Sequence, residues 1–263
     1  MAWLPGGRWR WVIAGVVLVA LVAGAIVAWP YVQLYTGAAP PAQFYQKVQP
    51  EPALAPDYPR VLGVAHNAGN NLGTLATALH YGADVIEIDV ISARGQLVAG
   101  RDQPWPWLAR RVFRGPTLTE AWGRAAAAGI VKLDLKQTDR TFLNDLVNFV
   151  APRASSRRVM ISSDDQQALL YLHTRLPDVT LLFSVNGPDA LHQLRSRPAL
   201  QQAIGGASVF QSLVDANLVT WAHRHKLLIL AWTVNDSQRL NQLVQLGVDG
   251  ITTANLAILR ALG

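Results

Sequence analysis

Two acidic residues stand two positions apart inside an apolar segment, "GADVIEIDV", at residues 82–90. If this segment is a β-strand, Glu87 and Asp89 point to the same face, because side chains in a strand alternate between faces. Two carboxylates on one face of a buried strand are costly unless a cation lies between them. The spacing returns in "IVKLDLK" with Asp134 and Lys136. Alternatively, Glu87 and Asp89 lie on a solvent-exposed face, and Asp134 and Lys136 only form an ion pair with each other.

Short apolar runs alternate with helix-like segments from residue 60 onward. They predict eight strands, at 61–65, 84–90, 130–135, 158–162, 179–185, 208–212, 227–234 and 247–253. The runs are rich in Val, Ile and Leu without strict alternation, which is typical of parallel strands buried on both faces. About 200 residues of such units favour an α/β fold, the (β/α)8 TIM barrel. The alternative is a doubly wound open sheet, but "AHNAGNN" after the first strand lacks the G-x-G-x-x-G spacing of that fold.

In a (β/α)8 barrel the carboxyl ends of the strands meet at one mouth, where the chemistry lies. His66 follows the first predicted strand, and Glu87, Asp89 and Asp134 belong to the next two. Three converging carboxylates offer the oxygen ligands that Mg²⁺ or Ca²⁺ prefers. Beside such a metal, His66 can act as base, acid or nucleophile. The alternative is a histidine with a purely structural hydrogen bond.

The motifs "GVAHNAG", "GADVIEIDV", "GQLVAGRD", "VKLDLK", "LAWTVND" and "LGVDGITT" follow one another in order over residues 60–260. This ordered set resembles the glycerophosphodiester phosphodiesterase family, and "VKLDLK" is also similar to the D-L-K of the related sphingomyelinase D enzymes. The resemblance implies a metal-dependent phosphodiesterase on a (β/α)8 barrel. The implied substrates are glycerophosphodiesters or phospholipid headgroups, cleaved by hydrolysis or by cyclisation.

The resemblance also implies roles for single residues. His66 corresponds to the first catalytic histidine and Lys136 to a lysine that contacts the phosphate. The remaining correspondences are Glu87, Asp89 and Asp134 as metal ligands, and Trp232 and Asn235 as residues that close the substrate pocket.

Several positions depart from the family pattern. Arg101 stands where the family has its second catalytic histidine, and Asn67 replaces the arginine after the first. Gly69 falls on the acid of the P-E-N segment, and Thr253-Ala254 stands where the family has T-D. We expect Arg101 in the catalytic set and Asn67 in the substrate-binding set.

Arginine at position 101 changes the chemistry that is available. A guanidinium holds a phosphate with two hydrogen bonds, but it does not exchange a proton near neutral pH. Loss of general acid–base catalysis costs about 10²–10⁴-fold in rate. The alternative to an enzyme is therefore a non-catalytic barrel that binds lipid headgroups or a partner at the membrane.

The composition limits the possible classes of protein. The chain has 263 residues, of which 51% are hydrophobic, enough for one sizeable core and an additional segment. The absence of cysteine excludes disulfides, thiolate metal sites and a cysteine nucleophile. The net charge is +6, but the cations are scattered along the chain. We expect no nucleic-acid partner, because anionic lipid or a phosphate substrate explains the charge as well.

The N-terminal region predicts a membrane anchor. Residues 11–29, "WVIAGVVLVALVAGAIVAW", carry no charge and approach the roughly 20 residues that span a bilayer. Arg8 and Arg10 precede them, which places the N-terminus in the cytoplasm and the later residues in the periplasm or outside the cell. A signal peptide cleaved at Ala23-Gly24-Ala25 is the alternative. The predicted division is an N-terminus and transmembrane anchor over 1–31, a Pro-rich linker over 32–59 and the barrel over 60–263.

Two further segments hold residues of interest. "WPWLARRVFRG", at 105–115, interleaves aromatic residues with arginines. It fits a loop that touches lipid headgroups, and equally a loop whose aromatic residues pack on the barrel. His223 and His225 have the spacing of a metal pair but precede a strand, so we expect structural histidines at the opposite end of the barrel.

Overall fold

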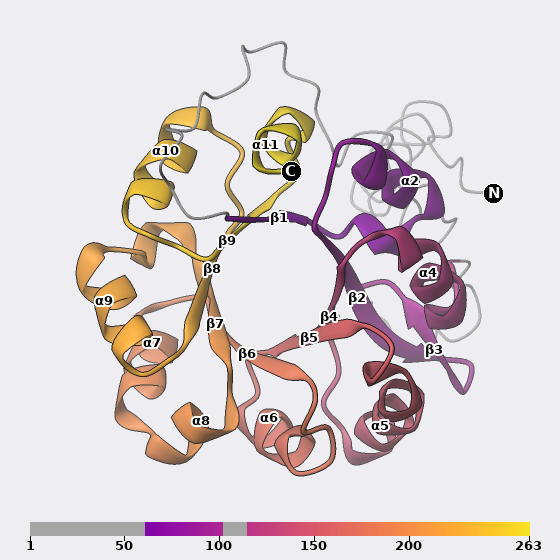
Figure 1. Ribbon diagram of the computed structural model, residues 1–263. Helices are drawn as coiled ribbons and strands as arrows, with labels where there is room; N and C mark the ends of the chain where they lie inside the picture. Colours follow the sequence, from indigo (N-terminus) through magenta and orange to yellow (C-terminus); the bar gives the residue numbers. More distant parts are fainter. Residues whose placement is uncertain (1–60, 102–114) are drawn as a thin grey trace, which may run out of the picture.

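A computed structural model describes residues 61–101 and 115–263 of the chain as a closed barrel with helices on its outside (Figure 1). The parallel strands are β1 (Leu62–Ala65), β2 (Val85–Ala93), β4 (Ile130–Leu135), β5 (Arg158–Ser163), β6 (Thr180–Val185), β7 (Gly206–Phe210), β8 (Leu228–Trp232) and β9 (Gly250–Thr253). The first strand pairs with both β2 and β9, which closes the ring. The predicted (β/α)8 barrel is confirmed, because an open sheet would leave two strands at its edges unpaired.

Helices fill the connections between the strands. They are α2 (Leu72–His80), α4 (Leu118–Arg124), α5 (Arg140–Ala154), α6 (Gln166–His173), α7 (Pro188–Ser196), α8 (Pro198–Ala203), α9 (Ala216–Arg224), α10 (Ser237–Gln245) and α11 (Leu256–Leu262). Short 3₁₀ turns lie at Ala68–Asn70, Ala125–Ala127 and Gln211–Leu213. Many helices begin at an Asn or Asp that accepts backbone N–H bonds, as Asp139 does from Phe142 at the start of α5. Such caps start these helices soon after the preceding strand ends.

The apolar side chains form two separate cores. The larger one lies between the barrel and its helices and includes Ile86, Ile88 and Leu133. A smaller cluster consists of Val64, Val85, Ile130, Met160, Leu182 and Leu230. The smaller cluster comes from β1, β2, β4, β5, β6 and β8, at residues that precede the predicted site residues on β1, β2 and β4. We call it the apolar plug, because it fills the barrel interior on the amino-terminal side of those residues.

A hairpin extends the second strand beyond its predicted end. Strand β2 continues to Ala93 and turns back into β3 (Gln96–Ala99), which pairs antiparallel to it. Both residues of the two-residue turn have positive φ, 54° at Arg94 and 71° at Gly95, as a tight hairpin turn requires. Strand β3 was not predicted from the sequence, and this hairpin returns the chain to Asp89.

Strand β7, the sixth of the parallel strands, begins and ends two residues earlier than predicted, at Gly206–Phe210 instead of 208–212. At Gly206 a Cβ would lie 2.6 Å from the carbonyl oxygen of Leu228. Glycine is therefore needed for this close approach between β7 and β8. After Phe210 the chain forms the 3₁₀ turn Gln211–Leu213.

The predicted membrane segment and linker, and most of segment 105–115, lie outside the described residues. Within 61–101 and 115–263, the structure contains no helix with the length and apolar character needed to cross a bilayer.

Candidate active site

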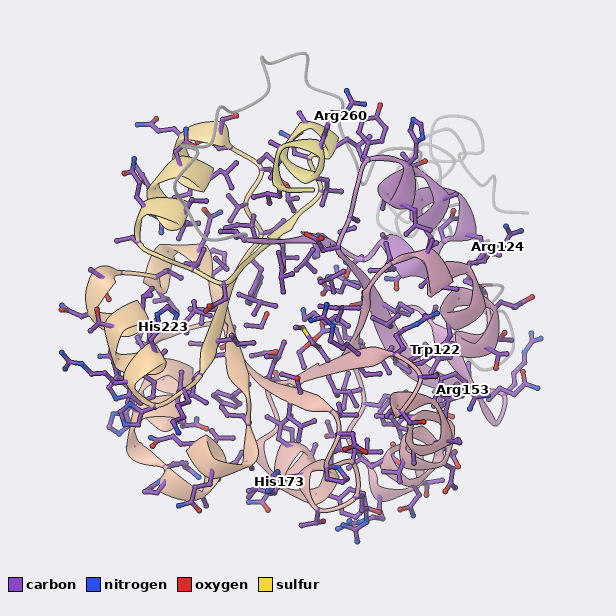
Figure 2. The ribbon with its side chains drawn as sticks, viewed as in Figure 1. Trp122, Arg124, Arg153, His173, His223 and Arg260 are labelled. Atoms are coloured by element: carbon purple, nitrogen blue, oxygen red, sulfur yellow. The ribbon has the colours of Figure 1, made fainter. Side chains whose placement is uncertain are left out.

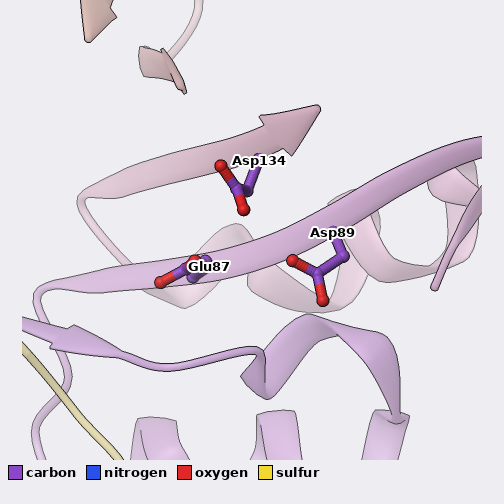
Figure 3. Close-up of side chains that lie close together, drawn as sticks. All are labelled: Glu87, Asp89 and Asp134. Atoms are coloured by element: carbon purple, nitrogen blue, oxygen red, sulfur yellow. The ribbon is translucent and has the colours of Figure 1, made fainter. Parts of the chain in front are cut away.

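The pairing of β2 with β4 brings the predicted acids together. Asp89 lies beside Asp134 in the paired strands, and Glu87 lies one pleat earlier on the same face of β2. One oxygen from each of the three carboxylates lies within 4.8 Å of the others. Figure 3 shows them close together, two on β2 and one on β4. Their predicted convergence is present in the structure, and their role as metal ligands stays a prediction.

Burial controls the ionisation of these acids. Glu87 is 4% exposed and Asp89 is 0% exposed. Burial raises the pKa of Glu87 to about 7, against the opposing charge of Lys132. Burial also raises the pKa of Asp89, with Lys136 opposing it. For Asp134, burial acts in the same direction, but Lys132 and Lys136 outweigh it and lower the pKa.

Lys136 and Arg101 both contact the acid cluster from the mouth of the barrel. Lys136 Nζ lies 3.3 Å from Asp89 Oδ1 and also donates to Asp134 Oδ2. Burial lowers the pKa of Lys136, but the two carboxylates outweigh burial and raise it to about 12. The hairpin brings Arg101 Nε to 3.1 Å from Asp89 Oδ2. Two of the predicted catalytic residues thus neutralise the same acid.

The donor set of the cluster fits a hard divalent cation. Carboxylate oxygens are the ligands that Mg²⁺ and Ca²⁺ prefer. Glu87 Oε2 is buried, and within 61–101 and 115–263 it meets no hydrogen-bond partner. A bound cation or a water would satisfy that atom. Glu87, Asp89 and Asp134 are therefore the residues that would hold a metal.

His66 lies at the end of β1, tied down by its backbone N–H, which donates to Thr253 O at 2.9 Å. In the orientation that satisfies its neighbours, the Asn67 amide donates to Asp89 Oδ1 at 3.1 Å. Its oxygen then accepts from His66 Nε2 at 3.3 Å and from Arg101 Nη2 at 3.2 Å. This arrangement places the imidazole proton on Nε2 and leaves Nδ1 as the acceptor. Burial and then the Arg101 charge lower the pKa of His66 from 6.5 to about 4, so the ring is neutral at pH 7.

The loop after His66 approaches β2 too closely to carry a side chain at position 69. A Cβ on Gly69 would lie 2.3 Å from Ile88 Cγ1, so no acid can stand at this position. The next residue, Asn70, makes the side-chain contact of this loop with β2. Asn70 Nδ2 donates to Asp89 Oδ2 at 2.8 Å, and Asn70 Oδ1 accepts from the Asp89 backbone N–H at 2.9 Å.

A cavity of about 360 Å³ opens beside the acid cluster. One side is lined by His66, Glu87, Arg101, Lys132, Asp134 and Lys136. The other side is lined by Asp164, Ser184, Asn186, Ser208 and Trp232. The cavity therefore combines a strongly charged wall with a wall of hydroxyl, amide, carboxylate and indole groups. Such a shape suits an anionic phosphate joined to a polar alcohol.

The two residues predicted to close the pocket are placed differently. Trp232 lines the cavity, and its buried Nε1 finds no hydrogen-bond partner in the described part of the chain. Asn235 instead connects the ends of β8 and β9. Its Oδ1 accepts from Thr253 Oγ1 at 3.1 Å and from the backbone N–H of Ala254 at 2.8 Å. The structure therefore does not bring Asn235 to the cavity wall.

Several residues of this site were not predicted from the sequence. Lys132 was detectable, because it shares the two-residue spacing of Asp134 and Lys136. Asn70 had no such signal, since its contact with Asp89 depends on how the loop folds back. The same holds for Ser162, which donates to Asp134 Oδ1 at 2.5 Å, and for the far wall of the cavity.

Residues 115–257 match the model of the glycerophosphoryl diester phosphodiesterase family. The matched range contains Asp134 and Lys136, while His66 and the acids of β2 precede it. No curated protein matches this chain.

Solved structures resemble the barrel over most of its length. A phosphodiesterase from Oleispira antarctica, in complex with the product sn-glycerol-3-phosphate, is 19% identical with a TM-score of 0.62, covering 78% of this chain and 96% of that one. A glycerophosphoryl diester phosphodiesterase from Parabacteroides distasonis is 17% identical with a TM-score of 0.59, covering 79% and 87%. The glycerophosphodiester phosphodiesterase of Thermotoga maritima is 16% identical with a TM-score of 0.56, covering 76% and 95%. At these identities the likeness supports the fold.

Proposed function

The chain belongs to the glycerophosphoryl diester phosphodiesterase family, whose members are phosphoric diester hydrolases, and we propose that its barrel mouth cleaves glycerophosphodiesters or phospholipid headgroups. Glu87, Asp89 and Asp134 would hold Mg²⁺ or Ca²⁺. When bound, such an ion supplies positive charge to the phosphoryl oxygens.

The chain's own residues would perform the remaining work. As a base, the neutral ring of His66 takes the proton of the attacking hydroxyl and returns it to the alcohol oxygen as the P–O bond to the alcohol breaks. As a nucleophile, it bonds to phosphorus while that P–O bond breaks, the alcohol takes a proton from water, and the attacking hydroxyl then displaces the histidine from phosphorus. Lys136 and Arg101 neutralise the charge that develops on the phosphoryl oxygens. Asn67 orients the imidazole through the hydrogen bond from His66 Nε2. Water as attacking group gives hydrolysis, and a hydroxyl of the substrate gives a cyclic product.

The observation that carries this proposal is the position of His66. A neutral imidazole lines the same cavity as Lys136, Arg101 and the acid cluster. The ring is neutral at pH 7, because burial lowers its pKa to about 4, so one ring nitrogen keeps a free lone pair. A structural histidine alone would not need this set of charges around one cavity.

The test uses the full chain, purified in detergent and freed of metal with a chelator. Glycerophosphocholine, glycerophosphoethanolamine and a lysophospholipid are supplied in turn, with Mg²⁺, Ca²⁺ or no metal, and the release of the alcohol is measured. We expect metal-dependent release, lost in His66→Ala and retained in His223→Ala. Metal binding without release of product from any substrate would instead support the non-catalytic barrel suggested by Arg101.

We further propose that residues 11–29 anchor the protein in the cell membrane, with the barrel in the periplasm or outside the cell. The uncharged run, the preceding Arg8 and Arg10 and the Pro-rich residues 32–59 support this proposal. Alkaline extraction of membranes tests this anchor, since an anchored chain stays with the lipid and a chain without an anchor is released. Removal of residues at the N-terminus of the mature protein, read by mass spectrometry, would identify a cleaved signal peptide.

A further inference from the structure

A buried lysine lies beneath the acid cluster and has no part in the function proposed above. Lys132 Nζ lies 3.2 Å from Glu87 Oε1, and both side chains are almost completely buried, at 3% and 5% exposure. The pairing of the strands explains the contact, because Glu87 and Lys132 are direct neighbours across β2 and β4. Met160 stands on the other side of Lys132 and belongs to the apolar plug. The ion pair is thus enclosed between the plug and the cavity.

Lys132 differs from the other two cations that contact the acids. The side chains of Lys136 and Arg101 are 23% and 50% exposed at the mouth. They can move from a carboxylate to a phosphoryl oxygen when a ligand enters. Lys132 lies deeper on β4, two residues before Asp134, and its side chain is only 3% exposed at the floor of the cavity, so its ammonium has little room to leave Glu87. Its charge therefore stays beside Glu87 whatever occupies the cavity.

Among the described residues, the three acids of the cluster are consequently matched by three cations, Arg101, Lys132 and Lys136. Each of Glu87, Asp89 and Asp134 has a lysine or arginine nitrogen in contact with it. A divalent ion bound by the acids would replace these contacts, and the partly exposed side chains of Lys136 and Arg101 can move away from the carboxylates. The ammonium of Lys132 cannot, and it repels the ion through a poorly screened interior.

We propose that Lys132 is an internal counter-ion of Glu87 that holds this carboxylate in place and weakens the binding of a divalent metal by the acid cluster. The inference rests on the proposed function, in that the cluster is taken to be its metal site. Lys132 is a positioning residue, since it contacts Glu87 and its charge acts on the metal only through space. Its structural purpose is to keep a buried acid paired when no metal is bound.

The experiment measures Mn²⁺ binding to the metal-free full chain in detergent, from the electron paramagnetic resonance signal of free Mn²⁺. Lys132→Gln removes the charge and keeps a hydrogen-bond donor for Glu87. We expect this variant to bind Mn²⁺ more tightly than the unchanged chain, by roughly tenfold or more. Lys226→Gln is the matched control, because Lys226 is an exposed lysine that precedes β8 at the opposite end of the barrel. Its Kd for Mn²⁺ should be unchanged.

Equal or weaker binding by Lys132→Gln would overturn the proposal, as would the absence of Mn²⁺ binding in both chains. If the variant does not fold without metal, its thermal unfolding is measured as Mn²⁺ is added. The proposal then requires that Mn²⁺ restores a cooperative transition, and a failure to restore it is contrary evidence. Both readouts are independent of turnover, so loss of the phosphodiesterase proposal and loss of this inference are distinguished.

Discussion

The two ends of the barrel contain the same kinds of residue and use them differently. At the mouth, acids from two strands converge, and His66 lies beside them in the cavity. At the opposite end, His223 Nε2 lies 3.0 Å from Asp249 Oδ2, but the side chains are 44% and 27% exposed. Figure 2 shows His223 on the outer ring of helices. A histidine near an acid therefore indicates a reactive site only where several buried charged groups lie together.

Two acids at the opposite end accept hydrogen bonds from the backbone. Asp84 Oδ2 accepts from the Gly63 N–H at 2.9 Å, and Asp249 Oδ2 accepts from the Ile229 N–H at 2.7 Å. Both acids follow a glycine two residues earlier, and Gly82 and Gly247 each have φ of 82°. These two turns of the same form connect a helix to the next strand. Here a carboxylate has a structural partner already, which leaves it unavailable to a ligand.

Removal of each histidine in turn is the strongest test of the difference between the two ends. We expect His66→Ala to lower kcat/KM by about 10²–10⁴-fold, because the neutral base or nucleophile is lost. His223→Ala should leave kcat/KM unchanged, since its ring is remote from the cavity. Initial rates with the best substrate of the panel provide the measurement. Equal losses in the two variants would show that the mouth is not the reaction site.

The pH dependence of folding provides a second test. Because the pKa of His66 falls from 6.5 to about 4 on folding, the unfolded chain takes up a proton below pH 6.5 that the folded chain takes up only near pH 4. The free energy of unfolding should therefore fall as the pH falls through this window, by no more than about 3 kcal/mol. Urea unfolding of the unchanged chain and of His66→Ala, which lacks this effect, isolates the contribution. A constant difference between the two chains from pH 6.5 to pH 4 would contradict it.

Truncation of Asp249 tests the structural role of the opposite end. Asp249→Ala leaves the buried N–H of Ile229 without its acceptor, so we expect a loss of about 1–3 kcal/mol in the free energy of unfolding. Below the unfolding transition, kcat/KM should stay the same. Chemical denaturation and initial rates on one preparation measure both quantities. A large loss of activity in the folded variant would mean that this end influences the site.

The smallest expected effect concerns the two tryptophans Trp232 and Trp221. Trp232 lines the cavity, and its buried Nε1 has no hydrogen-bond partner among the described residues. We expect Trp232→Phe to raise KM by about two- to tenfold, through loss of one hydrogen bond that the indole N–H makes when the substrate is bound. Trp221, which stacks on His225 with ring centroids 4.5 Å apart, is the matched control on α9. Trp221→Phe should leave KM unchanged. An unchanged KM in both variants would exclude the indole from substrate binding.

Much of the architecture was predictable from local patterns. Apolar runs of strand length alternating with helix-like segments indicated the eight parallel strands and the closed barrel. The β3 hairpin was missed because Arg94 and Gly95 form a two-residue turn that no Asn-Gly or Asp-Gly pair announces. The shift of β7 was missed because the close contact of Gly206 with Leu228 is a property of the packed barrel.

The site was predictable to the extent that strand geometry determines it. His66, Glu87, Asp89 and Asp134 were expected at one mouth and lie there. Asn235 was expected in the pocket, but its amide connects two strand ends instead, as its hydrogen bonds to Thr253 and Ala254 show. A side chain at a strand end can face the cavity or the neighbouring loop, and only the folded loop decides between them.

The amino-acid sequence by itself determined which side chains share a face, because the two-residue period of a strand does not depend on the rest of the protein. It thereby predicted that Glu87 and Asp89 share one face of a strand, and that Asp134 and Lys136 share another, before any contact was known. Only the tertiary structure decided which charges meet. The register of β2 against β4 pairs Glu87 with Lys132, and burial inside the closed ring shifts the pKa values, since both depend on residues distant in the chain.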